Sequence, residues 1–154
     1  MSKGLQPTIE TRGAGKAAYD LKQLGVRGSD IRRVADKVRR IYLRSNQRRF
    51  QTSGSGQWPA LKPSTVERKA RQGLDPRPLR ATGDLYRSLT STRAAEQEDV
   101  REPTELRFGT RVPYAGFHDQ GKGRMHRELI ELTASEREQV SKALGGYIAR
   151  DETT

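Results

Sequence analysis

The strongest pattern of hydrophobic and polar positions lies between residues 29 and 50. Apolar residues recur there every three or four positions, as they do on one face of an α-helix. Ser29 is a favourable N-cap, and Asp30 in the first turn suits the positive end of the helix dipole. We expect this helix to reach about Arg49, with Phe50 anchoring its end. The apolar stripe consists of Ile31, Val34, Val38, Ile41, Tyr42 and Ser45.

Shorter elements are expected after this helix. A capping-box spacing predicts helix starts at Ser64, followed by Glu67, and at Ser135, followed by Glu138. Alternating positions predict an antiparallel pair of strands joined by an acidic loop at 96–102. The expected elements are helices over about 64–72 and 83–88, strands at Leu89–Arg93 and Thr104–Arg111, a short helix at Tyr114–Gln120, an edge strand at Leu129–Leu132, and a final helix with Val140, Leu144, Tyr147 and Ile148 on its apolar face.

The two ends of the chain carry weaker patterns. Residues 1–15 are poor in apolar groups and are expected to form a flexible arm, with a short extended piece at Thr8–Thr11. A short helix is expected over residues 16–24, and residues 151–154 are expected to fray. The sequence therefore predicts one α+β domain over residues 16–150. It would contain a long basic N-terminal helix packed on a small antiparallel sheet, with short helices and a C-terminal helix.

Charge is concentrated in the first half of the chain. The 154 residues include 30 Lys+Arg and 19 Asp+Glu, a net charge of +11. Residues 1–77 have a balance of +12 and residues 78–154 a balance of −1. This asymmetry indicates a polyanionic partner, whereas the alternative is a solvated face that keeps the protein soluble. The candidate DNA-facing or partner-facing residues on the long helix are Arg33, Lys37, Arg40, Arg44 and Arg48.

The residue types present exclude several kinds of chemistry. The chain has no Cys, which excludes disulfides, thiolate metal ligands and a Cys nucleophile. It has two His, and no apolar run approaches the roughly 20 residues of a membrane span. We expect no signal peptide, no metal, no cofactor and no catalytic residue. The Gly13–Lys16 stretch lacks the spacing and the hydroxyl of a phosphate-binding loop, so it is not interpreted as one.

A series of short motifs in a fixed order is more specific than any of these patterns. It runs through most of the chain, from a basic helix ending at Phe to a late Arg followed by hydrophobic residues. The segments are Arg49-Phe50, Gly56–Leu61, Ser64–Lys69, Leu79–Leu85, Ser88-Leu89, Phe108–Thr110, Val112–Ala115, His118, Gln120-Gly121 and Arg127–Leu132. Their order resembles the tailed-phage virion morphogenesis family, which includes Mu-like neck proteins, tail completion proteins and lambdoid tail-component relatives. The resemblance covers about residues 17–149.

The resemblance implies a structural, non-enzymatic role at the head–tail junction. Such a protein would form a ring, commonly hexameric, that completes the tail and joins it to the head connector. It would reside in the virion, at the neck or the top of the tail, after assembly in the host cytoplasm. The implied partners are further copies of the chain, the tail tube protein, the connector or stopper proteins and the genomic DNA in the channel, but no membrane. Two alternatives stay open: a terminator ring that ends tail-tube polymerisation, and a sequence-independent nucleic-acid-binding protein.

Four motif residues are candidates for subunit or partner contacts. Tyr114 and His118 are spaced to share one face of a short helix, which could meet a neighbouring subunit. Arg127 could pair with an acidic group across an interface or stay solvated. Trp58 offers a large apolar anchor with an indole N–H donor, and ordinary core packing is the alternative. The acidic residues of 96–102 are a candidate complement for a basic patch on a neighbouring copy.

Overall fold

The computed structural model describes residues 8–12, 19–20, 30–119 and 127–151. These residues confirm the α+β class. In chain order the elements are β1 (Thr8–Arg12), β2 (Tyr19–Asp20), the 3-10 helix η1 (Ile31–Val34), α1 (Ala35–Gln51), α2 (Pro63–Arg71), α3 (Asp84–Thr90), β3 (Gln97–Glu102), β4 (Glu105–Thr110), α4 (Ala115–Asp119) and α5 (Ala134–Asp151).

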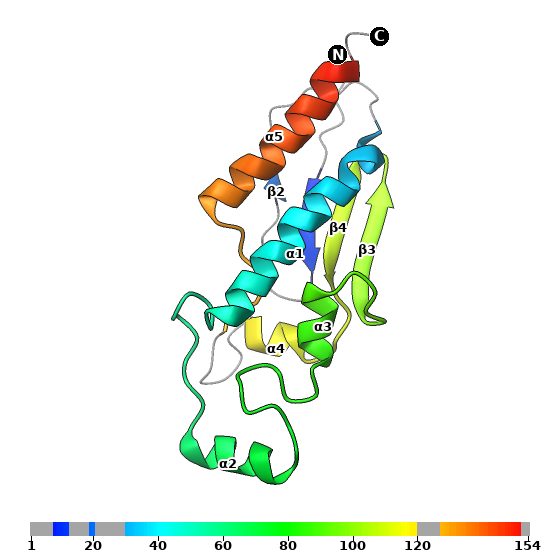
Figure 1. The fold of residues 1–154 in the computed structure, drawn as a ribbon. Helices are drawn as coiled ribbons and strands as arrows, with labels where there is room; N and C mark the ends of the chain where they lie inside the picture. Colours follow the sequence, from blue (N-terminus) through cyan, green and yellow to red (C-terminus); the bar gives the residue numbers. More distant parts are fainter. Residues whose placement is uncertain (1–7, 13–18, 21–29, 120–126, 152–154) are drawn as a thin grey trace.

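The strands form a mixed sheet in the order β2-β1-β4-β3. The hairpin of β3 and β4 is antiparallel, as expected, and β1 joins β4 in parallel with Ile9 opposite Leu106. The extended piece expected within the N-terminal arm is therefore a strand of the sheet. Tyr19–Asp20 is strand β2, so the helix expected over residues 16–24 is wrong there, and its other residues lie outside the described ranges. Figure 1 shows α1 crossing the sheet with α5 beside it.

The long helix begins one residue later than the sequence predicts and with a tighter first turn. Asp30 is the N-cap, because its side chain accepts a hydrogen bond from the Arg32 backbone N at 3.0 Å. The predicted cap Ser29 lies outside the described residues. After η1, α1 continues to Gln51, close to the expected end. Phe50 is buried, which confirms that it anchors the helix end.

The first predicted strand is wrong in position. Residues Leu89 and Thr90 end α3, and the strand itself lies in the segment expected to be an acidic loop. The short stretch 89–93 carried too few residues to separate alternation from helical spacing. In the structure Leu89 packs toward α1, whose Asn46 Nδ2 donates to the Leu89 carbonyl at 2.9 Å. This contact with a distant helix decides the local conformation.

The core lies between α1, the sheet and α5. Tyr42 on α1 stacks on Phe108 on β4, with ring centroids 5.9 Å apart. Val140 and Leu144 on α5 are buried, which confirms these two positions of the predicted apolar face. The core also includes Ile31, Val38, Leu85, Leu89, Leu106, Leu129 and Ile130.

Two predicted helix caps and one predicted strand are also wrong. Helix α2 begins at Pro63 after Lys62, so Ser64 lies inside the helix and caps nothing. The capping box of α5 lies two residues before the expected one: Thr133 N donates to Glu136 Oε2 at 2.9 Å, and Glu136 N donates to Thr133 Oγ1 at 3.2 Å. No strand forms at 129–132, although Leu129, Ile130 and Leu132 are buried. Side chains from other elements hold this segment instead.

Candidate functional site

The predicted basic residues form one exposed row along η1 and α1. The apolar stripe of the helix faces the core, so residues on the opposite face reach solvent. All five predicted cations are exposed: Arg33, Lys37, Arg40, Arg44 and Arg48. Arg48 forms an ion pair with Glu136 at 3.2 Å, and the other four have no ion pair with any described residue. The row therefore carries a net positive charge toward solvent.

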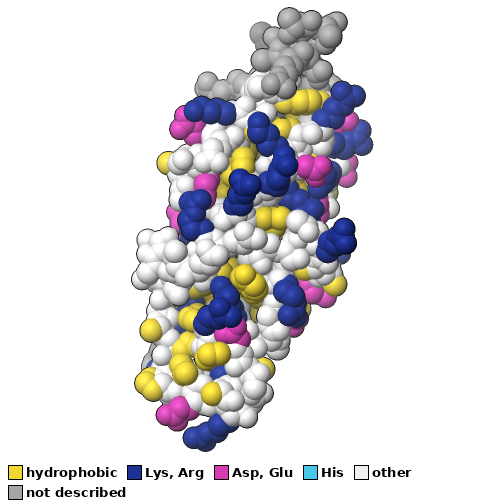
Figure 2. Space-filling view, in the orientation of Figure 1, with side chains coloured by type: hydrophobic (Ala, Val, Ile, Leu, Met, Phe, Trp, Pro, Cys, Tyr) yellow, Lys and Arg dark blue, Asp and Glu magenta, His cyan; other side chains and the backbone are white. Residues whose placement is uncertain are grey.

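The middle of this row borders a groove between α1 and α5. The groove has a volume of about 450 Å³ and is lined by Lys37, Arg40, Ile41, Arg44, Gln139, Lys142 and Ala143. Ile41 and Ala143 provide a narrow apolar floor between the charged side chains. Figure 2 shows Lys and Arg side chains gathered over the part of the molecule where Figure 1 shows α1. This arrangement can bind an extended anion without any reading of sequence.

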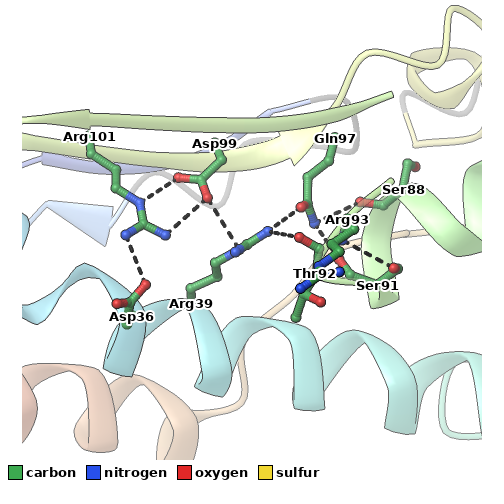
Figure 3. A network of polar contacts seen from close by, with 9 residues as sticks. All are labelled: Asp36, Arg39, Ser88, Ser91, Thr92, Arg93, Gln97, Asp99 and Arg101. Atoms are coloured by element: carbon green, nitrogen blue, oxygen red, sulfur yellow. Dashed lines mark hydrogen bonds and ion pairs between the residues drawn. The ribbon is translucent and has the colours of Figure 1, made fainter. Parts of the chain in front are cut away.

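Arg39, between these cations in sequence, points the other way and ties α1 to β3 (Figure 3). Its Nε lies 3.3 Å from Asp99 Oδ2, and its Nη2 donates to the Thr92 carbonyl at 2.9 Å and to the Gln97 side chain. Arg101 bridges Asp99 and Asp36, each at 2.8 Å. The basic residues of α1 therefore divide into an outer row and an inner network.

The inner network also accounts for the acidic segment 96–102. Asp99 is engaged by Arg39 and Arg101, and Glu98 lies 3.6 Å from Arg107 on the neighbouring strand. These cross-strand and helix-to-strand pairs explain how an acidic stretch forms a strand. Because Glu98 and Asp99 are engaged within the chain, they are poor complements for the basic row of another copy.

Three of the predicted contact residues meet at a second hollow. Tyr114, His118 and Arg127 line a pocket of about 380 Å³ together with Leu61, Lys69, Leu79, Ala81, Thr82 and Asp84. Tyr114 lies just before α4, and its ring is edge-to-face with that of His118 on α4, with centroids 6.3 Å apart, so the two side chains lie side by side. Tyr114 is 46% exposed, whereas Arg127 is 4% exposed. The Thr-Gly-Asp-Leu motif and the Tyr-Ala-x-x-His motif thus build one surface feature.

Burial shapes the chemistry of this pocket. Partial burial lowers the pKa of His118 below 6.5, and the nearby Arg127 guanidinium lowers it further. Burial also lowers the pKa of Lys69 from its usual value. Arg127 is held in place, since its Nη2 donates to the Pro59 carbonyl at 2.7 Å and its backbone N donates to the His118 carbonyl at 3.0 Å. The neutral imidazole of His118 and the positively charged side chains beside it suit the recognition of a chemical group on a partner.

The comparisons with known proteins agree with the order of the motifs. The sequence model of the phage virion morphogenesis family matches residues 14–150. The chain belongs to the phage virion morphogenesis family. No curated protein and no solved structure matches it. The resemblance is thereby confirmed, and the role of this morphogenesis protein is in the structure or assembly of the phage particle.

Trp58 of the morphogenesis protein is a core residue in this chain. It is 6% exposed, packs edge-on against Phe50 at 5.2 Å between centroids, and donates from Nε1 to the Glu128 carbonyl at 2.9 Å. The turn before it holds four successive positive φ values, from Ser53 to Gly56. The indole ring is therefore too buried to offer a surface for direct contact with a partner. Its hydrogen bond instead holds the segment that follows Arg127.

Two functional features of the morphogenesis protein were missed in the sequence. Phe117 is 55% exposed and its ring lies beside that of His118, with centroids 5.9 Å apart, so it adds an exposed aromatic surface next to this residue. Arg49 is a structural clamp, with its Nη2 2.9 Å from Glu131 Oε2 and its guanidinium directed at the Glu128 and Glu131 carbonyls. The adjacency of Phe117 to the predicted His118 could have indicated the former. In the sequence, Arg49 differed from its basic neighbours only by its place in the Arg49-Phe50 motif, which did not indicate a clamp.

The described residues hold no group of three or more His, Asp and Glu side chains arranged to bind a metal ion. None of the helices in the described part of the chain has the length and apolar composition to cross a lipid bilayer.

Proposed function

We propose that this chain is a structural, non-enzymatic protein at the head–tail junction. It forms a ring that completes the tail and joins it to the head connector, and it resides at the neck of the virion. The observation that carries the proposal is the match to the phage virion morphogenesis family over residues 14–150. The partners are further copies of the chain, the tail tube protein and the connector or stopper proteins, with genomic DNA in the channel.

Two surfaces support an assembly role. A ring needs heterologous contacts, in which one patch of a subunit meets a different patch of the next. The exposed aromatic side chains Tyr114 and Phe117 beside the His118 pocket offer one such patch. Aromatic side chains that keep one face in solvent are enriched at protein interfaces. The basic row offers a separate surface on the α1 side of the molecule, so the two can serve different partners.

The second candidate is a terminator ring that caps the tail tube and ends its polymerisation. It would use the same position and the same ring symmetry, and the basic row and the aromatic patch suit either role. Tail length separates the two, because only a terminator limits growth of the tube.

Electron microscopy of lysates tests the proposal, using the parent phage with this gene disrupted. Full heads beside separate tails of normal length support the joining and completion role. Tails of irregular, excessive length favour the terminator. Normal infectious particles overturn both and leave the basic row to be explained as a nucleic-acid-binding surface.

A further inference from the structure

We propose that the groove between α1 and α5 binds the phosphate backbone of duplex DNA. The inference rests on the proposed head–tail position, where DNA passes from the head into the tail, and it names the partner of the basic row. The observation behind it is the row of exposed cations beside a groove of about 450 Å³, in which Lys37, Arg40 and Arg44 have no ion pair to the described part of the chain.

The spacing of the row matches a linear polyanion. Lys37, Arg40, Arg44 and Arg48 fall within about a quarter of the helix circumference, because α-helices have 3.6 residues per turn. At 1.5 Å per residue the row is about 16 Å long. One strand of DNA presents a phosphate every 3.4 Å of helix axis, and because the strand winds around that axis its successive phosphates lie farther apart along the strand, so the row reaches only a few of them. A row of this kind can follow one strand of the duplex.

The acidic residues of α1 and α5 neutralise only part of the charge of the groove. Asp36 turns to Arg101 at 2.8 Å, Glu136 turns to Arg48 at 3.2 Å, and Glu138 turns to Lys142 at 2.8 Å. Asp36 on α1 and both glutamates at the start of α5 therefore already have ion-pair partners. Lys37, Arg40 and Arg44 are left as the cations available to a ligand.

The lining of the groove favours phosphate over bases and over an acidic segment of another copy. None of the described residues that line it is aromatic, so they provide no platform on which the bases of a single strand could stack. Among these described lining residues Gln139 is the one with an uncharged polar side chain, which leaves little capacity to read base edges. Of the acidic residues on β3, Glu98 and Asp99 pair within the chain, and Glu102 at the end of the strand is exposed. Duplex DNA bound through its backbone fits these features best.

The test is fluorescence anisotropy of the full-length chain with a labelled random-sequence 30-base-pair duplex over a range of salt concentrations. Three phosphate contacts predict that log K falls against log salt with a slope of about −2.7. The R40Q/R44Q variant removes two of them, so the slope should fall to about −0.9 and binding at low salt should weaken at least tenfold. The matched control R68Q/R71Q removes the same charge from α2, where both side chains are exposed. It should bind like the wild type, and circular dichroism verifies the fold of each variant.

Three results overturn the inference: no duplex binding by the wild-type chain, equal loss in the two double variants, or tighter binding of polyglutamate than of DNA at matched charge. The last result would assign the groove to an acidic polypeptide. The assay uses the isolated chain and is independent of the lysate experiment. A chain that fails to bind DNA overturns this inference alone, whereas infectious particles without the gene overturn the head–tail role.

Discussion

Substitution of Gly54 by Ala tests how the turn after α1 positions Trp58. Gly54 has φ +67°, which L-residues with a side chain adopt only at a cost. A Cβ added there would lie 2.4 Å from Trp58 Cδ1 and 2.5 Å from Nε1, well inside normal contact. Because the indole ring is held by Phe50 and by its hydrogen bond to the Glu128 carbonyl, it has little freedom to retreat.

The expected loss of stability has two parts. The left-handed backbone costs about 1–2 kcal/mol for Ala. Forcing the buried ring aside adds about 1–3 kcal/mol, the usual range for overpacking a core. The total for G54A is about 2–5 kcal/mol, and at about 2–4 °C per kcal/mol for a chain of this size the midpoint should fall by roughly 4–20 °C.

Gly56 provides the matched control. It has φ +80°, and a Cβ there would meet nothing within 4 Å. G56A should therefore carry only the backbone cost of about 1–2 kcal/mol. Urea unfolding followed by tryptophan fluorescence, with thermal unfolding in parallel, measures both variants. Equal losses in G54A and G56A would refute the reasoning, because they would show that Trp58 is not wedged against the turn.

Three further predictions concern stability and titration. E136A should destabilise the chain by about 2–3 kcal/mol in urea unfolding, since it removes the α5 capping box and a buried hydrogen-bond acceptor. E138A removes only an exposed ion pair and should change the stability far less, so similar losses in the two variants would contradict the assignment. Hydrogen bonding from the Arg77 side chain lowers the pKa of Asp75 to about 2, so its stabilising effect is complete above about pH 4 and is lost as the pH falls toward 2. D75N should therefore lose less stability than the wild type between pH 4 and pH 2, and parallel curves would argue against the pair. The imidazole of His118 should titrate below pH 6.5 in proton NMR, and a midpoint at or above that value would show that the side chain is not buried as described.

The motif residues show how far sequence reasoning reached the candidate site. The exposed row on α1 was predictable, because helical spacing alone places Lys37, Arg40 and Arg44 opposite the apolar stripe. The spacing of Tyr114 and His118 likewise predicted a shared face. Their meeting with Arg127 in one pocket was not predictable from spacing, since eight residues lie between His118 and Arg127 and the approach depends on the path of the chain between them.

Arg39 and Arg40 illustrate the same limit at neighbouring positions. Both are arginines on one helix, yet Arg39 is part of an internal network and Arg40 lines an open groove. A step of one residue rotates the side chain by about 100° around the helix axis, so helical spacing separates the two directions, but only the position of β3 gives Arg39 its partner Asp99. Charge counting along the sequence cannot make this distinction.

By itself, the sequence determined the α+β class, the long basic helix, the excess of positive charge in the first half and the family, because these depend on local periodicity, composition and the order of motifs. The tertiary structure alone decided that an acidic stretch is strand β3, that Trp58 is a core residue, and that residues 129–132 are buried without forming a strand. In each of these cases the local preference is weak, and partners distant in sequence supply the hydrogen bonds, ion pairs and burial that fix the conformation.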